Sequence, residues 1–200
     1  MIVRERPADG TAEGALVLFH GRGADENDLF PLLDLLDPER RRNGYCPRGP
    51  LSLPPGGAHW YAVYEVGHPD PATFAPTYAA AAAWLDSLPH SSVWLGGFSQ
   101  GAVMSYALGL GAGRPRPDAI VAFSGFIPDT PAWEGDFSQP LPPVAIGHGV
   151  YDAVISVEYS RVARRTLTDA GAEVLYREYP LDHTLEPGFV GDVAEWLRRL

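Results

Sequence analysis

The stretch Val93-Trp94-Leu95-Gly96-Gly97-Phe98-Ser99-Gln100-Gly101-Ala102-Val103-Met104 decides the fold of this chain of 200 residues. An apolar run leads into Gly97-Phe98-Ser99-Gln100-Gly101, and small residues in a helical pattern follow. A strand, a sharp turn and a helix form the context in which Gly-x-Ser-x-Gly lifts a serine hydroxyl off a sheet edge. Gly97 and Gly101 lack the Cβ atoms that would collide where strand and helix cross. We predict that Ser99 is a nucleophile; the alternative is an N-capping serine at an ordinary turn.

Apolar runs and helical patterns alternate along the rest of the chain. The predicted strands are residues 1–6, 15–20, 44–48, 91–98, 119–123, 144–148 and 173–179. The predicted helices are residues 25–36, capped by Asp25, then 71 or 76 to 88, 99–110, 157–170, and a last one from 187 or 188. Strands that alternate with helices predict an α/β fold with a mostly parallel sheet covered on both faces.

Two long segments lack this alternation. Residues 51–71 are rich in proline, glycine and aromatic residues, and we interpret them as a loop over the site. The alternative is a surface connection whose aromatic residues form a small separate cluster. Residues 126–143 carry five prolines and no periodicity, which indicates a second long loop.

Length, composition and charge limit the classes of protein. The chain suits one domain, residues 1–200, and its 46% hydrophobic and 20% charged residues are typical of a globular protein. A net charge of −10 repels nucleic acid and anionic membranes, so we expect neither as a partner. We expect no signal peptide and no stable membrane insertion, and a cytoplasmic location. The single cysteine, Cys46, excludes an intramolecular disulfide and is expected to be buried.

Two further residues stand where parallel sheets place their sites, at the carboxyl ends of strands. Asp152 follows the predicted strand at 144–148, and His183 follows the one that ends near residue 179. With Ser99 they give the order Ser, Asp, His of the α/β-hydrolases. The alternatives are that Asp152 only caps the next helix and that His183 is a surface histidine. His20 and His148, each within a His-Gly pair, are expected to brace loops, and the chain has no metal-ligand spacing of histidines and carboxylates.

The chain resembles the phospholipase/carboxylesterase group of α/β-hydrolases, which includes bacterial carboxylesterases and acyl-protein thioesterases. The segments that carry the resemblance run in order through the chain: residues 18–25 (LFHGRGAD), 47–50 (PRGP), 60–61 (WY), 96–102 (GGFSQGA), 123–125 (FSG), 148–152 (HGVYD) and the region of His183.

The resemblance implies an α/β-hydrolase fold without a cofactor or metal. Ser99, Asp152 and His183 would form the catalytic triad, and the backbone amides of Arg22 and Gln100 the oxyanion hole. Trp60 and Tyr61 would contact the substrate. Arg22 stands where relatives often carry leucine and Asp182 where glycine is common, departures that bear on specificity more than on mechanism.

We therefore expect a hydrolase of carboxylic esters that works through an acyl-enzyme, with a small-molecule ester or thioester as its partner. One alternative is a thioesterase that acts on acylated protein or acyl-coenzyme A. Another is a hydrolase-fold binding module without catalysis. The sequence leaves the oligomeric state open, a homodimer included.

Overall fold

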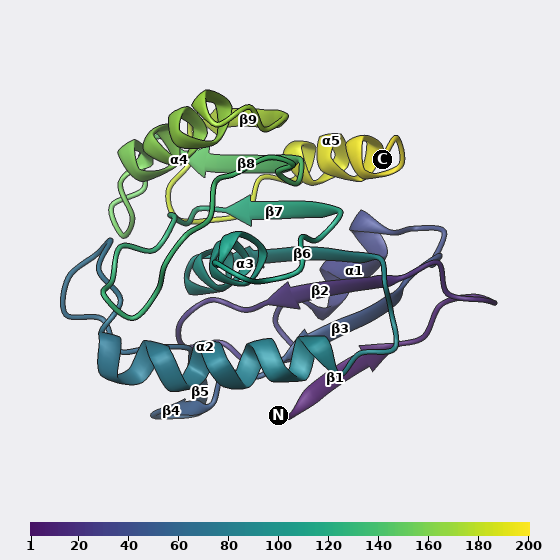
Figure 1. The fold of residues 1–200 in the computed structure, drawn as a ribbon, viewed down its shortest axis with the longest axis horizontal. Helices are drawn as coiled ribbons and strands as arrows, with labels where there is room; N and C mark the ends of the chain where they lie inside the picture. The colour runs from purple at the N-terminus through teal and green to yellow at the C-terminus, as the bar shows by residue number, and fades with distance from the viewer.

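A seven-stranded sheet forms the centre of the protein in the computed structural model, which describes residues 1–200. In sheet order the strands are β1 (Val3–Arg6), β3 (Asn43–Pro47), β2 (Ala15–Phe19), β6 (Val93–Phe98), β7 (Ala119–Phe123), β8 (Val144–Gly149) and β9 (Val174–Tyr179). Only β1 runs antiparallel to its neighbour; every other pair is parallel. In Figure 1 the strands follow one another from β9 at the top to β1 at the bottom. The predicted mostly parallel sheet is confirmed, with strand ends placed to within about two residues.

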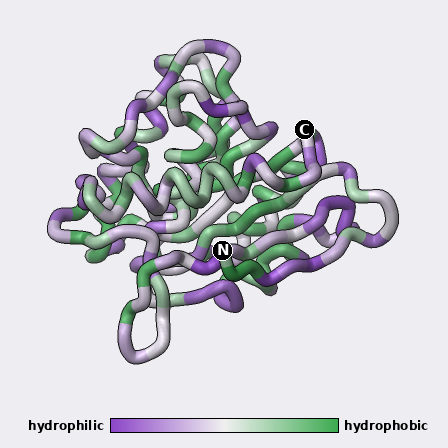
Figure 2. The backbone as a smooth tube through the Cα atoms, turned by 60° about the horizontal axis from the view of Figure 1, so that its bottom comes forward, coloured by the Kyte–Doolittle hydropathy of each residue, from purple (hydrophilic) through white to green (hydrophobic).

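Five helices cover the two faces of the sheet: α1 (Phe30–Leu36), α2 (Pro71–Asp86), α3 (Gln100–Leu110), α4 (Val157–Asp169) and α5 (Pro187–Leu197). Side chains alternate along each strand, so Leu16 and Leu18 of β2 pack with α1 and α5. Val17 and Phe19 point the other way and pack with α2 and α3. Figure 2 shows hydrophobic segments gathered along the strands of the interior and many hydrophilic ones at the turns. None of the helices has both the length and the apolar character needed to cross a membrane.

The first helix begins later than predicted. It starts at Phe30, with Pro31 in its first turn, where the missing N–H of proline needs no partner. Asp25 does not cap it, because its Oδ1 accepts a hydrogen bond from the backbone N–H of Asn27 at 2.9 Å. Residues between β2 and α1 therefore form turns, and Arg22 lies within them.

The segment 51–71 contains a short hairpin, so the prediction of loop alone was wrong there. Strands β4 (Leu51–Leu53) and β5 (Gly57–His59) pair antiparallel. Trp60 and Tyr61 are almost fully buried and belong to the main core between β2 and α3, not to a separate cluster. Residues 126–143 contain no helix or strand, as predicted.

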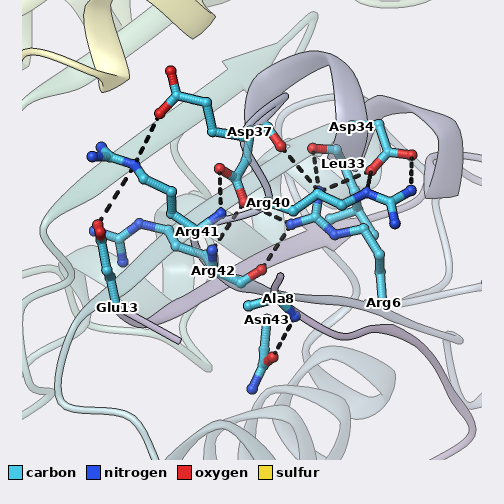
Figure 3. A network of polar contacts seen from close by, with 11 residues as sticks. Arg6, Ala8, Glu13, Leu33, Asp34, Asp37, Arg40, Arg41, Arg42 and Asn43 are labelled. Carbon is cyan, nitrogen blue, oxygen red and sulfur yellow. Dashed lines mark hydrogen bonds and ion pairs between the residues drawn. The ribbon is translucent and has the colours of Figure 1, made fainter. Parts of the chain in front are cut away.

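A buried ion pair joins β1 to the connection between α1 and β3 (Figure 3). Arg6 of β1 donates from Nη2 to Asp37 Oδ2 at 2.6 Å and to the carbonyl oxygen of Arg42 at 2.7 Å. Both Arg6 and Asp37 are about 5% exposed or less. The Asp37 carboxylate also accepts from the backbone N–H groups of Arg41 and Arg42, each at 3.0 Å. Such additional hydrogen bonds are what a buried pair needs to offset its desolvation.

Cys46, on β3, is 1% exposed and packs in the core with α1 and α5, as predicted for a buried cysteine. Burial raises the pKa of its thiol to about 12. The thiol is therefore protonated at neutral pH and is not a nucleophile.

Candidate active site

Ser99 lies at the tight turn between β6 and α3, and its backbone adopts φ 56° and ψ −121°. A residue other than glycine rarely adopts a positive φ, and such strain clusters at functional sites. The Ser99 N–H donates to the carbonyl oxygen of Phe123 in β7 at 2.9 Å, which holds the turn against the sheet. A Cβ on Gly97 would lie 2.8 Å from the backbone nitrogen of Ala102, and one on Gly101 would lie 2.8 Å from the carbonyl oxygen of His20. The predicted need for both glycines is confirmed.

A continuous chain of hydrogen bonds joins Ser99, His183 and Asp152. The Nε2 atom of His183 lies 2.9 Å from Ser99 Oγ, and Nδ1 lies 2.6 Å from Asp152 Oδ2. A carboxylate only accepts hydrogen bonds, so Nδ1 carries the proton and Nε2 is free to accept from the serine hydroxyl. The Asp152 side chain is fully buried, and that of His183 is 17% exposed. The structure thus brings together the three residues predicted as a triad, from the ends of β6, β8 and β9.

Asp152 is held by backbone groups on its other oxygen. Oδ1 accepts from the N–H groups of Val154 at 2.9 Å and Ile155 at 2.8 Å. The N-cap of α4 is Ser156, whose hydroxyl accepts from the N–H of Glu158. The alternative in which Asp152 only caps that helix is therefore wrong.

His148 contacts the Asp152 carboxylate, and no motif in the sequence predicts this contact. Its Nε2 lies 2.8 Å from the carbonyl oxygen of Ile155 and 3.2 Å from Asp152 Oδ2. Burial lowers the pKa of His148, so the ring is neutral and Nε2 carries its proton toward these two acceptors. The predicted role as a loop brace is confirmed. The only signal in the sequence for this contact is that His148 and Asp152 are four residues apart, at the end of a strand and in the turn that follows it.

His20 braces the loop that carries Arg22. Its Nδ1 donates to the carbonyl oxygen of Gly21 at 2.7 Å, and its Nε2 accepts from the N–H of Gly49 at 2.9 Å. Burial lowers the pKa of His20, so it stays neutral and one nitrogen can accept. The prediction of a bracing histidine is confirmed.

Two backbone amides beside Ser99 have no partner in the secondary structure. The N–H of Arg22 makes no hydrogen bond, and Gln100 is the first residue of α3, where a helix leaves N–H groups free. The Gln100 side chain accepts from the N–H of Trp60 at 3.0 Å and donates to the carbonyl oxygen of Tyr61 at 2.9 Å, which holds that loop in place. The structure leaves both amides free to donate, and their role as an oxyanion hole stays a prediction.

A cavity of about 300 Å³ opens beside Ser99 and has a mostly apolar wall. The residues that line it are Arg22, Tyr61, Val63, Glu65, Val66, Ser99, Gln100, Phe126, Val154 and Ile155. A larger hollow of about 720 Å³ lies at the amino ends of β6, β7 and β8 and contains none of the predicted site residues. No group of three or more histidine, cysteine or carboxylate side chains stands together as a metal-binding set.

Of the two aromatic residues predicted to contact substrate, only Tyr61 lines this cavity. Trp60 is fully buried, and its Nε1 donates to the carbonyl oxygen of His20 at 2.9 Å. The prediction for Trp60 is corrected: the indole supports the strand end that leads to Arg22 and does not face the cavity. The direction of one side chain in an aromatic pair cannot be read from a loop without strand periodicity.

A serine hydrogen-bonded to a histidine, at the carboxyl edge of a mostly parallel sheet covered by helices, is typical of one class of enzyme. The protein is a serine hydrolase of the α/β-hydrolase type. Within that class, the family model described as Phospholipase/Carboxylesterase matches residues 5–200. The chain belongs to this family, as its resemblance predicted.

Individual relatives agree with this assignment. Acyl-protein thioesterase 1 of Candida albicans is 25% identical over 222 aligned positions, which cover 97% of this chain and 95% of the relative. The structure of Zea mays acyl-protein thioesterase 2 is similar with a TM-score of 0.78 and 25% identity, covering 99% of this chain and 98% of that one. The Bacillus cereus carboxylesterase shares the fold with a TM-score of 0.85 at 22% identity, covering 98% and 93%. The names of these relatives include both esterases and thioesterases.

Proposed function

We propose that the protein hydrolyses carboxylic esters of small molecules through a covalent acyl-enzyme on Ser99. The observation that carries this proposal is the unbroken hydrogen-bonded series from Ser99 Oγ through His183 to the buried Asp152. In this arrangement the imidazole accepts the serine proton while the oxygen attacks a carbonyl carbon.

The reaction has two halves. Ser99 Oγ bonds to the carbonyl carbon, its proton moves to His183 Nε2, and the carbonyl oxygen becomes an oxyanion near the amides of Arg22 and Gln100. The intermediate then expels the alcohol, which takes the proton from His183 and leaves an acyl group on Ser99. A water molecule next attacks the acyl carbon, His183 takes its proton and returns it to Ser99, and the acid leaves. Asp152 holds the Nδ1 proton and stabilises the imidazolium in both halves.

The cavity favours small substrates. Its volume of about 300 Å³ is at the lower end of the range for ligand pockets, and its wall is mostly apolar. Thioester hydrolysis is the second candidate, because a relative 25% identical over nearly the whole chain is named an acyl-protein thioesterase. A series of p-nitrophenyl esters of increasing acyl length, assayed beside thioesters of the same acids, separates the two.

The test of the proposal is Ser99→Ala. Loss of the nucleophile should reduce turnover of p-nitrophenyl butyrate by about 10³-fold or more, with an unchanged circular dichroism spectrum. A fluorophosphonate probe should label the wild type and not the variant, which also excludes a binding module without catalysis. A variant that keeps a tenth of the wild-type kcat overturns the assignment of Ser99.

A further inference from the structure

Arg22 is unusual among the basic residues of this chain. All 15 basic residues are arginines. All but two of them donate to an acceptor, pair with a carboxylate or lie over an aromatic ring. The exceptions are Arg22 and Arg165. Both are exposed, but Arg165 lies on α4 away from the site, whereas Arg22 lines the cavity beside Ser99.

A guanidinium without a partner at this position matters for binding. It keeps its positive charge at every relevant pH and presents five N–H donors in a planar fork that matches a carboxylate or phosphate. The chain as a whole carries a net charge of −10, so an anionic substrate is repelled until it reaches a local cation. Arg22 supplies that cation in the cavity that Ser99 also lines.

The second charge on the cavity is Glu65, and it does not neutralise Arg22. Glu65 lines the same cavity, is exposed, and forms no ion pair within 4.0 Å with Arg22 or with any other cation. The remaining wall is mostly apolar, formed by residues such as Val66, Phe126 and Ile155. The cavity wall therefore carries one positive and one negative group that do not pair with each other, among mostly apolar residues, which fits a short apolar chain with an anionic end beside Arg22.

We propose that the Arg22 side chain makes this site selective for esters that carry an anionic group near the scissile bond. The proposal rests on the ester hydrolysis proposed above and names its substrate class. The anion is a carboxylate or a group of similar charge, on either the acyl or the alcohol part of the ester. The backbone N–H of Arg22 serves the oxyanion independently of this, so one residue has two separable contributions.

The experiment compares pairs of esters that differ in one charge. For the acyl part, the pair is mono-p-nitrophenyl glutarate and p-nitrophenyl pentanoate. For the alcohol part, the pair is 4-carboxyphenyl butanoate and 4-carbamoylphenyl butanoate. The readout is the ratio of kcat/KM for the anionic ester to that for the neutral one. Each ratio is compared between variants, so differences in the intrinsic reactivity of the esters cancel.

Arg22→Gln should lower the ratio for at least one pair by about fivefold or more, since a charge-assisted hydrogen bond is lost. The affected pair identifies the part of the ester that carries the anion. Arg22→Lys, which keeps the charge without the fork, should restore part of the ratio. Glu65→Gln should raise it, because a negative charge is removed from the same cavity. Arg165→Gln is the matched control: it changes the net charge equally and should leave both ratios within about twofold.

The outcomes separate this inference from the proposed function. If Ser99→Ala hydrolyses the neutral esters as fast as the wild type, the function itself is wrong. If the wild type acts through Ser99 and Arg22→Gln leaves both ratios unchanged, only the anion selectivity is overturned.

Two controls support the comparison. Labelling of Arg22→Gln by a fluorophosphonate confirms that this variant is folded. If Arg165→Gln changes the ratios as much as Arg22→Gln does, the effect comes from net charge, and a local role of the Arg22 side chain is rejected.

Discussion

Gly101→Ala should both destabilise the protein and impair its site. A methyl group there would lie within 3 Å of the carbonyl carbon and oxygen of Phe19 and 2.8 Å from the carbonyl oxygen of His20. These are backbone atoms of β2 and its end, so no rotamer change relieves the clash, and β2 and α3 must separate by on the order of 1 Å. Overpacking of a core typically destabilises by about 1–3 kcal/mol, and we expect the upper part of this range even after the gain of about 0.5–1 kcal/mol from alanine in a helix.

The assay is urea unfolding followed by circular dichroism, together with kcat/KM on p-nitrophenyl butyrate. With a slope of about 2 kcal/mol per molar urea, a loss of about 3 kcal/mol lowers the midpoint by about 1.5 M. Activity should fall by about 10²-fold, because β2 carries the loop of Arg22 and a 1 Å misplacement has such an effect. Gly191→Ala in α5 is the control: its Cβ meets nothing within 4 Å, so stability should rise slightly. A Gly101→Ala variant with the wild-type midpoint and activity would refute the reasoning about this crossing.

Three further changes test the site and the core. Asp152→Asn should lower kcat by about 10³- to 10⁴-fold, because an amide favours the wrong imidazole tautomer; Asp129→Asn and Asp136→Asn are the controls, and a larger loss in either would mean that another carboxylate acts. Asp37→Ala should destabilise by up to about 3–5 kcal/mol in urea unfolding, since Arg6 stays buried and only the half-exposed Asp34 remains to pair with it. Arg40→Ala, which breaks an exposed pair, should change stability by less than about 1 kcal/mol, and equal effects would contradict the role of burial. Stability should also fall as pH falls from 7.5 to 5, because burial lowers the pKa of His20 and of His148 in the folded state, while the unfolded chain takes up protons near pH 6.5. Each histidine contributes at most about 1.4 kcal/mol of unfolding free energy per pH unit. His148→Gln should therefore reduce the slope of unfolding free energy against pH. A urea midpoint that does not change with pH would disprove this role of the two histidines.

The central part of the fold could be predicted because its signals are local. The apolar run before Ser99, the glycines on either side and the small residues after it all lie within a dozen positions. The start of α1 was misplaced for a local reason too. The same aspartate chemistry that caps a helix also closes a turn on a nearby N–H, and Asp25 does the latter with Asn27.

Contacts between residues far apart in the chain could not be predicted from the sequence. Arg6 and Asp37 are 31 residues apart, and neither stands in a motif. The indole of Trp60 faces the core because Gln100, forty residues away, fixes the backbone of its loop. The lack of a partner for Arg22 could not be predicted either, because it depends on which acceptors the fold brings near that side chain.

The burial of Cys46 makes the protein suited to site-specific labelling. With a pKa of about 12 and 1% exposure, its thiol is ionised to only about one part in 10⁵ at pH 7 and is closed to reagents. A new cysteine on the surface would therefore be the only reactive thiol, with the native residue left in place. Tyr64, which is 86% exposed between Val63 and Glu65 of the cavity wall, is the position of choice. A fluorophore attached there would report the binding of a substrate from one labelled position, and the core around Cys46 would be unchanged.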